Sequence, residues 1–326
     1  MSPTAPNANS PARALIIGHF STVGDIESLE AVKDWCASAG LPFDIAPYSK
    51  SLQARMDGAI SPAQADPLRY SHVIVVCGPC YEDLLHRNGV RLEEYQHCHK
   101  IGVNLTMVAP LAEWNPFDVL VERDSDRATR ADLTFTRPIE RGSVVGRCVV
   151  KRQREYGARQ RHNETLALID DLIRRRNLAS IEIATDWPSA STLVANNSST
   201  ILSSILSRVD VLLTNRLHGF VYALRNGVPV LAIDAVAGGD KLTRQARALG
   251  WPVCLQADTA TTAEIDRSFA WCLSEEARSA AKAVSAAAME AARAIEEEAA
   301  AALVLPPKPR PARLPPRSAW ELLFRR

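Results

Sequence analysis

The residues best suited to chemistry form one short segment, Thr214-Asn215-Arg216-Leu217-His218-Gly219, which follows the apolar run 209–213. The apolar run predicts a buried strand, so the segment lies at a strand-to-helix turn, where open α/β sheets bind ligands. The helix N-terminus at such a turn presents unpaired N–H groups and a dipole that favours anions. Arg216 adds a planar donor fork for a carboxylate or phosphate, and His218 can gain or lose a proton near neutral pH. We therefore expect an anion site with His218 as its acid–base group.

The same turn also has an interpretation that needs no ligand. Arg216 can pair with an acidic residue elsewhere in the fold, and His218 can simply cap the following helix. Gly219 then serves only a close approach of the backbone to its neighbours. For an isolated Arg-x-His pattern this alternative stays open.

A basic run, residues 151–162, follows the apolar run 144–150. If that apolar run is a parallel strand, Arg152 and Arg154 lie at the same edge of the sheet as Arg216 and add positive charge to the site. A solvated basic loop explains the run equally well.

A second strand-to-helix turn is expected near the N-terminus, after the apolar run 14–17. It contains Gly18, His19, Gly24 and Asp25, and we expect a flexible junction with polar groups facing a ligand. A glycine-containing turn of this kind is weak support for a site when it stands alone, and a plain turn is the alternative.

Apolar runs of strand length alternate with helical patterns along most of the chain. This alternation indicates parallel sheets with right-handed crossovers, and its repetition predicts an α/β fold of two doubly wound, Rossmann-like domains facing a cleft. Mixed charges with Pro138 and Gly142 interrupt the pattern at 137–142, where we place the domain boundary. The expected strands are 14–17, 73–76, 101–108, 144–150, 181–184, 209–213 and 228–233; the expected helices are 26–38, 163–176, 200–207, 216–225, 241–249, 263–273 and 275–303. The expected regions are a disordered N-terminus (1–12), a first domain (13–140), a second domain (141–256), Ala-rich helices (257–304) and a Pro/Arg-rich tail (305–326).

The segment that begins at Asp210 resembles the signature of the polysaccharide pyruvyltransferase family. The family has an Arg-Leu-His-Gly turn, an Ala-Leu helix, a Gly-(Val/Ile)-Pro-Val element and a strand, all of which have counterparts in residues 216–233. Lys241 is similar to a Lys that the family places at the start of the following helix, although the connection here is slightly longer. The N-terminal turn resembles the family's Gly-Asn-x-Gly-Asp-Glu-like opening, but Ile26 stands where an acid is usual.

This resemblance implies a GT-B-like enzyme that transfers pyruvate from phosphoenolpyruvate to a sugar as a ketal. It implies His218 as the general acid, since a neighbouring phosphate favours the charged imidazole. The donor is expected to bind through Arg216, Lys241, Gly219 and one of Arg152 or Arg154, and the glycan or glycoside acceptor near Gly18, His19, Gly24 and Asp25. Phosphoenolpyruvate is the co-substrate, and the scheme requires no metal and no other cofactor.

Two other function classes stay open. A GT-B-type glycosyltransferase with a nucleotide-sugar donor has the same fold, because one fold hosts many activities. A non-catalytic protein that binds sugars or anions needs the cationic groups but no titrating His218.

The Cys77-Gly78-Pro79-Cys80 motif permits two more alternatives. It matches a redox Cys-x-x-Cys pair, and with His97, Cys98 and His99 it permits a zinc site. The flanking residues lack the context of a thioredoxin, and His97-Cys98-His99 is crowded for zinc-finger spacing. We expect neither a redox role nor a metal.

Composition excludes several broad classes. The chain of 326 residues has 38 Lys plus Arg and 37 Asp plus Glu, so it lacks the basic excess of a nucleic-acid-binding protein. No run of about 18 apolar residues predicts a membrane span, and the N-terminus does not resemble a signal peptide. Seven scattered cysteines form no disulfide framework, which favours a cytoplasmic protein.

Overall fold

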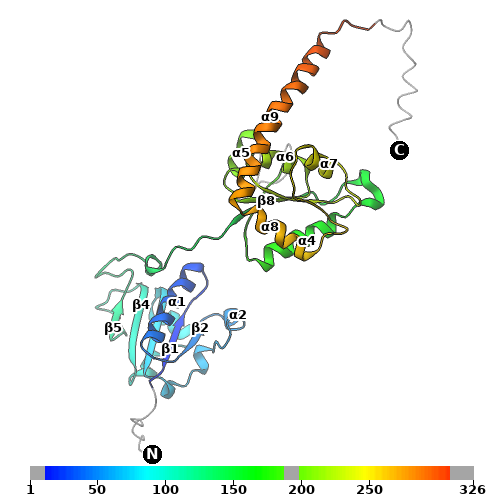
Figure 1. Cartoon of the computed structure of the whole chain (residues 1–326). Coiled ribbons are helices and arrows are strands. Elements are labelled where there is room, and N and C mark those ends of the chain that lie inside the picture. Colours follow the sequence, from blue (N-terminus) through cyan, green and yellow to red (C-terminus); the bar gives the residue numbers. More distant parts are fainter. Residues whose placement is uncertain (1–11, 187–197, 309–326) are drawn as a thin grey trace, which may run out of the picture. The chain divides into compact units, whose positions relative to one another are not determined.

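The computed structural model describes residues 12–186 and 198–308. The chain forms two compact units with a boundary between Glu140 and Arg141, inside the interval 137–142. Each unit contains one five-stranded sheet with helices on its faces (Figure 1). The predicted fold class, two doubly wound α/β units, is confirmed.

In unit 1, the sheet has the order β2-β1-β3-β4-β5, and all of its neighbouring strands are parallel. Successive side chains of β3 alternate between two apolar clusters, one with Ile74 and Val76 under helix α1 and one with Val73 and Val75 on the other face. The elements are β1 (Ala14–Gly18), α1 (Val23–Ser38), β2 (Phe43–Pro47), α2 (Lys50–Gln53), β3 (His72–Cys80), α3 (Glu82–Arg87), β4 (His99–Met107) and β5 (Val119–Val121), with short 3-10 turns η1 (Pro62–Gln64), η2 (Pro67–Arg69), η3 (Leu92–Tyr95) and η4 (Leu133–Thr136).

In unit 2, the sheet has the order β10-β9-β8-β6-β7 and is again entirely parallel. Helices α4 and α8 lie on one face, and α5, α6 and α7 lie on the other (Figure 1). The elements are β6 (Val144–Cys148), η5 (Arg154–Arg159), α4 (His162–Arg175), β7 (Ala179–Glu182), α5 (Ser199–Leu206), β8 (Val211–Thr214), α6 (Leu217–Arg225), β9 (Val230–Asp234), α7 (Lys241–Ala248), β10 (Cys254–Gln256), α8 (Thr262–Cys272) and α9 (Glu275–Leu303).

Both sheets have the same topology. Numbered from the first strand of each unit, the order is 2-1-3-4-5, so the chain reverses direction across the sheet between the first and third strands. Ligands of doubly wound sheets bind outside the carboxyl ends of the strands at this switch point. The switch point lies between β1 and β3 in unit 1 and between β6 and β8 in unit 2.

Several elements differ from the sequence predictions. Helix α1 begins at Val23 instead of residue 26, because Thr22 and Asp25 form a capping box that starts the helix earlier. Strands β2, β5 and β10 were not predicted; all three lie at a sheet edge and are only partly buried, so they lack the apolar run of the central strands. Helix α9 has the predicted bounds. Residues 1–11 and 309–326, most of the predicted disordered N-terminus and basic tail, lie outside the described residues.

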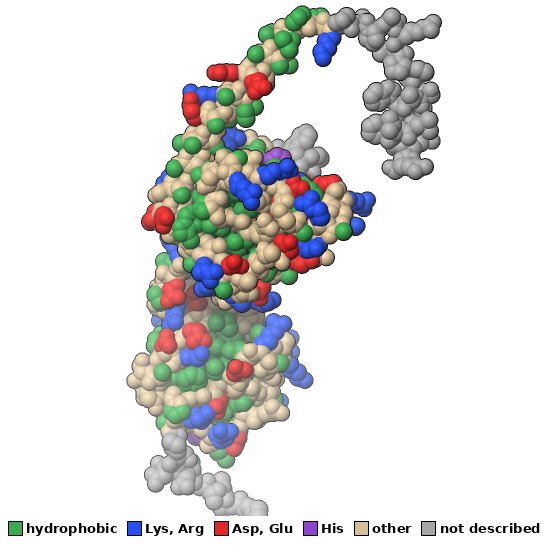
Figure 2. All heavy atoms as spheres, turned by 45° about the vertical axis from the view of Figure 1, so that its right-hand side comes forward, with side chains coloured by type: hydrophobic (Ala, Val, Ile, Leu, Met, Phe, Trp, Pro, Cys, Tyr) green, Lys and Arg blue, Asp and Glu red, His purple; other side chains and the backbone are tan. Residues whose placement is uncertain are grey.

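Helix α9 packs on its unit through its first half only. Ala277 and Ala281 are buried, and the helix makes its main contacts with α6. From Met289 onward every described residue is exposed, and both apolar and charged side chains lie on the surface of this part of the helix (Figure 2). The second half of α9 therefore does not pack on the fold of its unit.

Candidate functional site

Unit 2 gathers the predicted donor-binding residues at one edge of its sheet. Arg152 and Arg154 follow β6, Arg216 and His218 follow β8, and Lys241 follows β9. Strands β9, β8 and β6 are direct neighbours and run in parallel, so the turns after them meet at the carboxyl edge. Arg152, Arg154, Arg216 and His218 flank the switch point itself.

The turn after β8 is fixed to the loop after β6 by side-chain hydrogen bonds. The Thr214 hydroxyl donates to the carbonyl of Cys148 at 2.5 Å and accepts the N–H of Arg216 at 2.9 Å. The Asn215 amide accepts the N–H of Val150 at 2.7 Å and donates to its carbonyl at 3.0 Å. These buried polar residues hold the backbone on both sides of the switch point in place.

Gly219 permits the close packing of α6 against these strands. A Cβ atom on Gly219 would lie 2.7 Å from the Cys148 sulfur and 2.8 Å from the Thr214 hydroxyl, so no side chain fits. The glycine therefore positions the helix N-terminus, as expected of a turn that requires close approach.

The N-terminus of α6 has no side-chain cap. Arg216 occupies the N-cap position without a capping hydrogen bond, and the N–H groups of Leu217 and His218 donate to no acceptor among the described residues. The His218 side chain is exposed and has no hydrogen bond or ion pair within the described part of the chain. Unpaired N–H groups and the helix dipole make this end of α6 suited to an anion, with an imidazole beside it.

Arg216 pairs with Asp186, a residue that the sequence analysis did not identify. The guanidinium makes a two-pronged contact with the carboxylate, with Nη1 2.9 Å from Oδ2. The Arg216 hydrogen bonds lower the pKa of Asp186. Arg216 thus pairs with an acidic residue, as the interpretation without a ligand predicts. An incoming anion would have to share Arg216 with Asp186 or displace Asp186. No local pattern connects two residues 30 positions apart.

Lys241 begins α7 and lies over an aromatic ring. Its Nζ is 5.6 Å from the centroid of Tyr156 in η5, and it pairs with no carboxylate among the described residues. Lys241 thus contributes uncompensated positive charge, and Tyr156 adds a half-buried aromatic surface beside it.

A buried carboxylate orders the loop that presents Lys241. Asp234 ends β9, and its Oδ2 accepts hydrogen bonds from the N–H of Asp240 at 2.9 Å and the N–H of Thr243 at 3.0 Å. The loop between them turns through Gly238 and Gly239, both with positive φ. An acid at a strand end with Gly-Gly a few residues later is a sequence signal for an ordered loop of this kind.

The loop after β6 is tied to the same connection. Arg159 donates to the carbonyls of Ala237 and Gly239 at 3.1 Å each, and the Arg161 N–H donates to the carbonyl of Ala235 at 2.8 Å. Arg152 and Arg154 are exposed and have no partner among the described residues. Both arginines therefore fit the interpretation of a solvated basic loop. Their charge is also available to a ligand at the carboxyl edge of the sheet.

His162, at the start of α4, was also missed. It is buried, and neither ring nitrogen has a hydrogen-bond partner among the described residues. Burial, and after it the charge of Lys241, lower its pKa, although the nearby acids Glu155 and Asp234 oppose this. His162 is therefore a neutral imidazole close to the loops that form the edge.

The predicted acceptor-side residues in unit 1 form a self-satisfied turn. Gly18 has no room for a side chain, because a Cβ would lie 2.5 Å from the carbonyl oxygen of Val76. The His19 ring packs edge-on against Tyr48, 4.9 Å between centroids. Gly24 lies in the first turn of α1, which Thr22 and Asp25 cap.

Asp25 serves as the capping acid of α1. Its carboxylate accepts the N–H groups of Ser21 and Thr22, both at 3.0 Å. Burial raises its pKa, but hydrogen bonds from Cys77, Thr22 and Ser21 outweigh that effect and lower the pKa overall. The flexible junction predicted here is instead an ordered helix start, because the capping box satisfies its polar groups.

The cysteine motif does not have the geometry of a redox pair. Cys77 packs in the cluster under α1 and Cys80 in the cluster on the opposite face of the sheet, as alternation along a strand requires for residues three apart. Burial raises the pKa of both thiols, that of Cys80 to about 12, whereas a redox cysteine needs a lowered pKa. Within residues 12–186 and 198–308, no three His, Cys, Asp or Glu side chains are grouped as a metal site would need.

Comparisons with known proteins give no family. No protein-family model and no curated protein matches the chain. Solved structures with a similar arrangement include the spinosyn rhamnosyltransferase SpnG complexed with thymidine diphosphate (13% identity, 84% of this chain and 95% of that chain, TM-score 0.31). They also include the calicheamicin glycosyltransferase CalG4 (15% identity, 92% and 78%, TM-score 0.31) and UDP-GlcNAc 2-epimerase from Methanocaldococcus jannaschii (9% identity, 82% and 94%, TM-score 0.27). Likeness at this level assigns no activity. In the described part of the chain, no helix is both long and apolar enough to cross a membrane.

Proposed function

We propose that the chain is a transferase that binds a phosphate-bearing donor at the carboxyl edge of the unit 2 sheet, and that this donor is phosphoenolpyruvate. The observation that carries the proposal is the uncapped N-terminus of α6, with the unpaired, exposed imidazole of His218 in its first turn. The exposed His218 side chain has no partner among the described residues, so its imidazole is free to meet a ligand bound at the end of α6.

The groups at this edge match a compact trianion. The free N–H groups of α6 and the cation of Lys241 supply positive potential, and Arg216 supplies a fork that fits a carboxylate. Asp186 occupies that fork in the structure, so the carboxylate of the donor would share or displace it. Arg152 or Arg154, both exposed on the adjacent loop, would complete the charge balance at the rim.

Ketal formation assigns His218 a definite step. Its imidazolium donates a proton to the methylene carbon of phosphoenolpyruvate, which makes the adjacent carbon electrophilic. A sugar hydroxyl attacks that carbon and loses its proton, inorganic phosphate leaves, and a second hydroxyl closes the cyclic ketal. The enzyme stabilises the charge on the phosphate and carboxylate throughout. The proposed acceptor is a glycan or glycoside.

Tyr156 favours one alternative donor, a nucleotide sugar. Its half-buried ring next to Lys241 is an arrangement that can receive a base or ribose on the ring and a diphosphate on the cation. In that case the chain would be a glycosyltransferase, and His218 would be the base for the acceptor hydroxyl.

Thermal unfolding in the presence of each donor class separates the two. We expect phosphoenolpyruvate at millimolar concentration to raise Tm, and UDP or thymidine diphosphate to leave it unchanged. Release of inorganic phosphate from phosphoenolpyruvate, measured with a panel of glycosides, then tests transfer. Stabilisation by the nucleotides alone would reverse the assignment, and stabilisation by neither would remove the anion site.

A further inference from the structure

A second, separate pocket lies in unit 1, far along the sequence from every residue proposed to bind the donor. It has a volume of about 300 Å³ and is formed by α3, η3, the start of β4 and the loop after β4. This volume is at the lower end of the range for small-molecule sites, roughly 300–1,000 Å³. It therefore suits a ligand the size of a single sugar ring and is small for a nucleotide.

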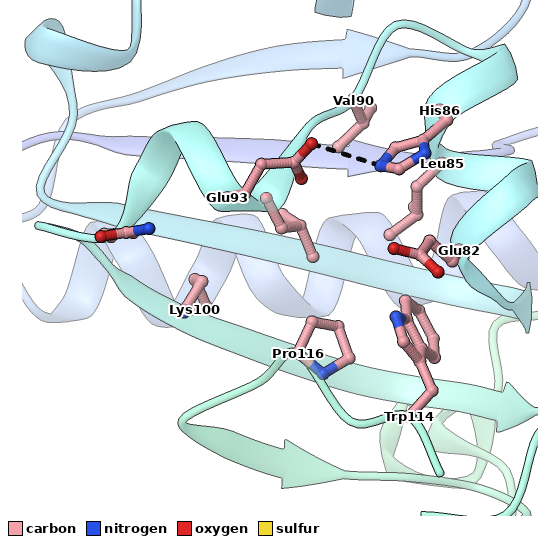
Figure 3. Close-up of a pocket in the computed structure, with 10 residues that line it drawn as sticks. Glu82, Leu85, His86, Val90, Glu93, Lys100, Trp114 and Pro116 are labelled. Atoms are coloured by element: carbon pink, nitrogen blue, oxygen red, sulfur yellow. Dashed lines mark ion pairs between the residues drawn. The ribbon is translucent and has the colours of Figure 1, made fainter.

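One wall of the pocket is an aromatic surface on a well-held loop. Trp114 and Pro116 line it, and both are half-buried (Figure 3). The backbone N–H of Trp114 donates to the carbonyl of Pro110 at 3.1 Å. The Asn115 side chain accepts the backbone N–H of Phe117 at 3.2 Å. Buried Phe117 anchors the loop in the core, so the indole is in place before any ligand binds.

The opposite wall comes from α3 and η3 and carries polar groups. Figure 3 shows His86 and Glu93 facing each other across from Pro116, with Nε2 and Oε1 3.4 Å apart. The carboxylate of Glu82, which lies on the Trp114 side, and the amide of Gln96 have no hydrogen-bond partner among the described residues. Buried Leu85 fills the floor between the polar groups and the indole.

Two of the charged side chains that line the pocket have a partner of opposite charge, which leaves the carboxylate of Glu82 as the free charged group in the described part of the chain. Lys100 is opposed by Asp118 at 3.9 Å, and Glu93 is opposed by His86 and by Arg91, at 3.4 and 3.7 Å. Glu82 is left as an unpaired acceptor. The pocket thus offers one carboxylate, one amide and an indole N–H as free hydrogen-bonding groups beside a flat apolar face.

We propose that this pocket binds one neutral sugar ring, with a C–H face of the ring on Trp114 and hydroxyl groups hydrogen-bonded to Glu82 and Gln96. A sugar ring has one face of C–H groups and a rim of hydroxyls, which are the two features that the walls complement. Carboxylate and amide oxygens accept from hydroxyls, and the carboxylate forms the stronger, charge-assisted hydrogen bond. This site does not depend on the identity of the donor proposed above.

Titration calorimetry of the full chain with methyl glycosides of glucose, galactose, mannose and N-acetylglucosamine tests the proposal. At least one is expected to bind at millimolar concentration. Trp114→Ala should weaken that binding about tenfold or more, since the main apolar contact is lost. Glu82→Gln should weaken it by a smaller factor. Trp35→Ala, which removes an exposed indole outside the pocket, is the matched control and should bind as the unchanged chain does.

Two outcomes would overturn the site. One is that no glycoside binds, or that binding is equal in Trp114→Ala and Trp35→Ala when both variants show the same cooperative thermal unfolding. The other is that tetramethylammonium binds at Trp114 and the glycosides do not, which would make the pocket a cation site. Sugar binding that persists in Arg216→Ala would show that this pocket binds its ligand independently of the donor site.

Discussion

Two strand-to-helix turns flank the switch points, one after β1, the first strand of unit 1, and one after β8, the third strand of unit 2, and they differ in chemical state. In α1 of unit 1, Thr22 and Asp25 form a complete capping box at the N-cap and third helical positions. In α6 of unit 2, Arg216 and Gly219 occupy those two positions and no side chain caps the helix. The second helical position holds Gly24 in α1 and the unpaired His218 in α6. The α1 turn uses its polar groups to cap its own helix, whereas the α6 turn leaves its polar groups available to a ligand.

This difference shows how a ligand site can be distinguished from a structural turn. Position at the switch point nominates both turns equally. Only the hydrogen-bond partners separate them, because a polar group already satisfied within the fold has less to offer a substrate. By this criterion we place the proposed donor site in unit 2.

Replacing His218 should have the largest effect, because this residue is the proposed acid–base group of the α6 turn. His218→Ala should lower turnover about 10²–10⁴-fold, the usual range for an acid–base group, with no change in thermal unfolding. The measurement is phosphate release from phosphoenolpyruvate with a glycoside acceptor. His97→Ala, another exposed histidine, is the control and should keep full activity. Wild-type turnover in His218→Ala would remove the proton donor from the scheme.

Variants of Arg216 and Asp186 test whether their ion pair competes with donor binding. Arg216→Ala should raise the donor dissociation constant about 10–150-fold, the equivalent of one charged hydrogen-bonding group at about 1.5–3 kcal/mol. Asp186→Asn should instead tighten donor binding, because it removes the competing carboxylate. Calorimetric titration with phosphoenolpyruvate measures both. An unchanged constant in Arg216→Ala would assign Arg216 to the fold alone.

The two early helical glycines should respond in opposite directions. Gly219→Ala places a methyl group against Cys148 and Thr214 and should destabilise the chain by about 1–3 kcal/mol. In Gly24→Ala the nearest atom is the Thr134 methyl at 3.7 Å, so the substitution should stabilise α1 by about 0.5–1 kcal/mol. Urea unfolding of both variants provides the comparison. Equal shifts would mean that α6 is not held closely against its sheet.

Asp25 should act on stability and leave donor binding unchanged. Asp25→Ala should lower the stability of unit 1 by about 0.5–2 kcal/mol through loss of the cap. Because the folded pKa of Asp25 is lowered, its contribution is complete above the unfolded value of about 3.9 and disappears as the pH falls through the folded pKa. Unfolding measured at pH 7 and again near pH 2.5 should show the difference between Asp25→Ala and the unchanged chain shrinking. A constant difference would exclude the charge as its source.

Sequence patterning was sufficient where the signal is local. Helices α7 and α9 begin where predicted, because the residue spacing that marks each helix lies in consecutive residues. The apolar strands β1, β3, β4, β6, β8 and β9 were also found, although their ends differ by a few residues. The short strands β2, β5 and β10 were missed, because register and neighbours create them more than their own composition does.

The sequence by itself determined the alternation of strands and helices and the cluster Arg216, His218 and Gly219 at one turn. These are properties of neighbouring residues, and periodicity and residue type are enough to reveal them. Tertiary structure alone decided that Asp25 caps a helix, that Asp186 occupies Arg216, and that Trp114 faces Glu82 across a pocket. Each of those outcomes depends on which groups meet across the fold and satisfy one another's hydrogen bonds and charges, and the distance along the chain does not record this.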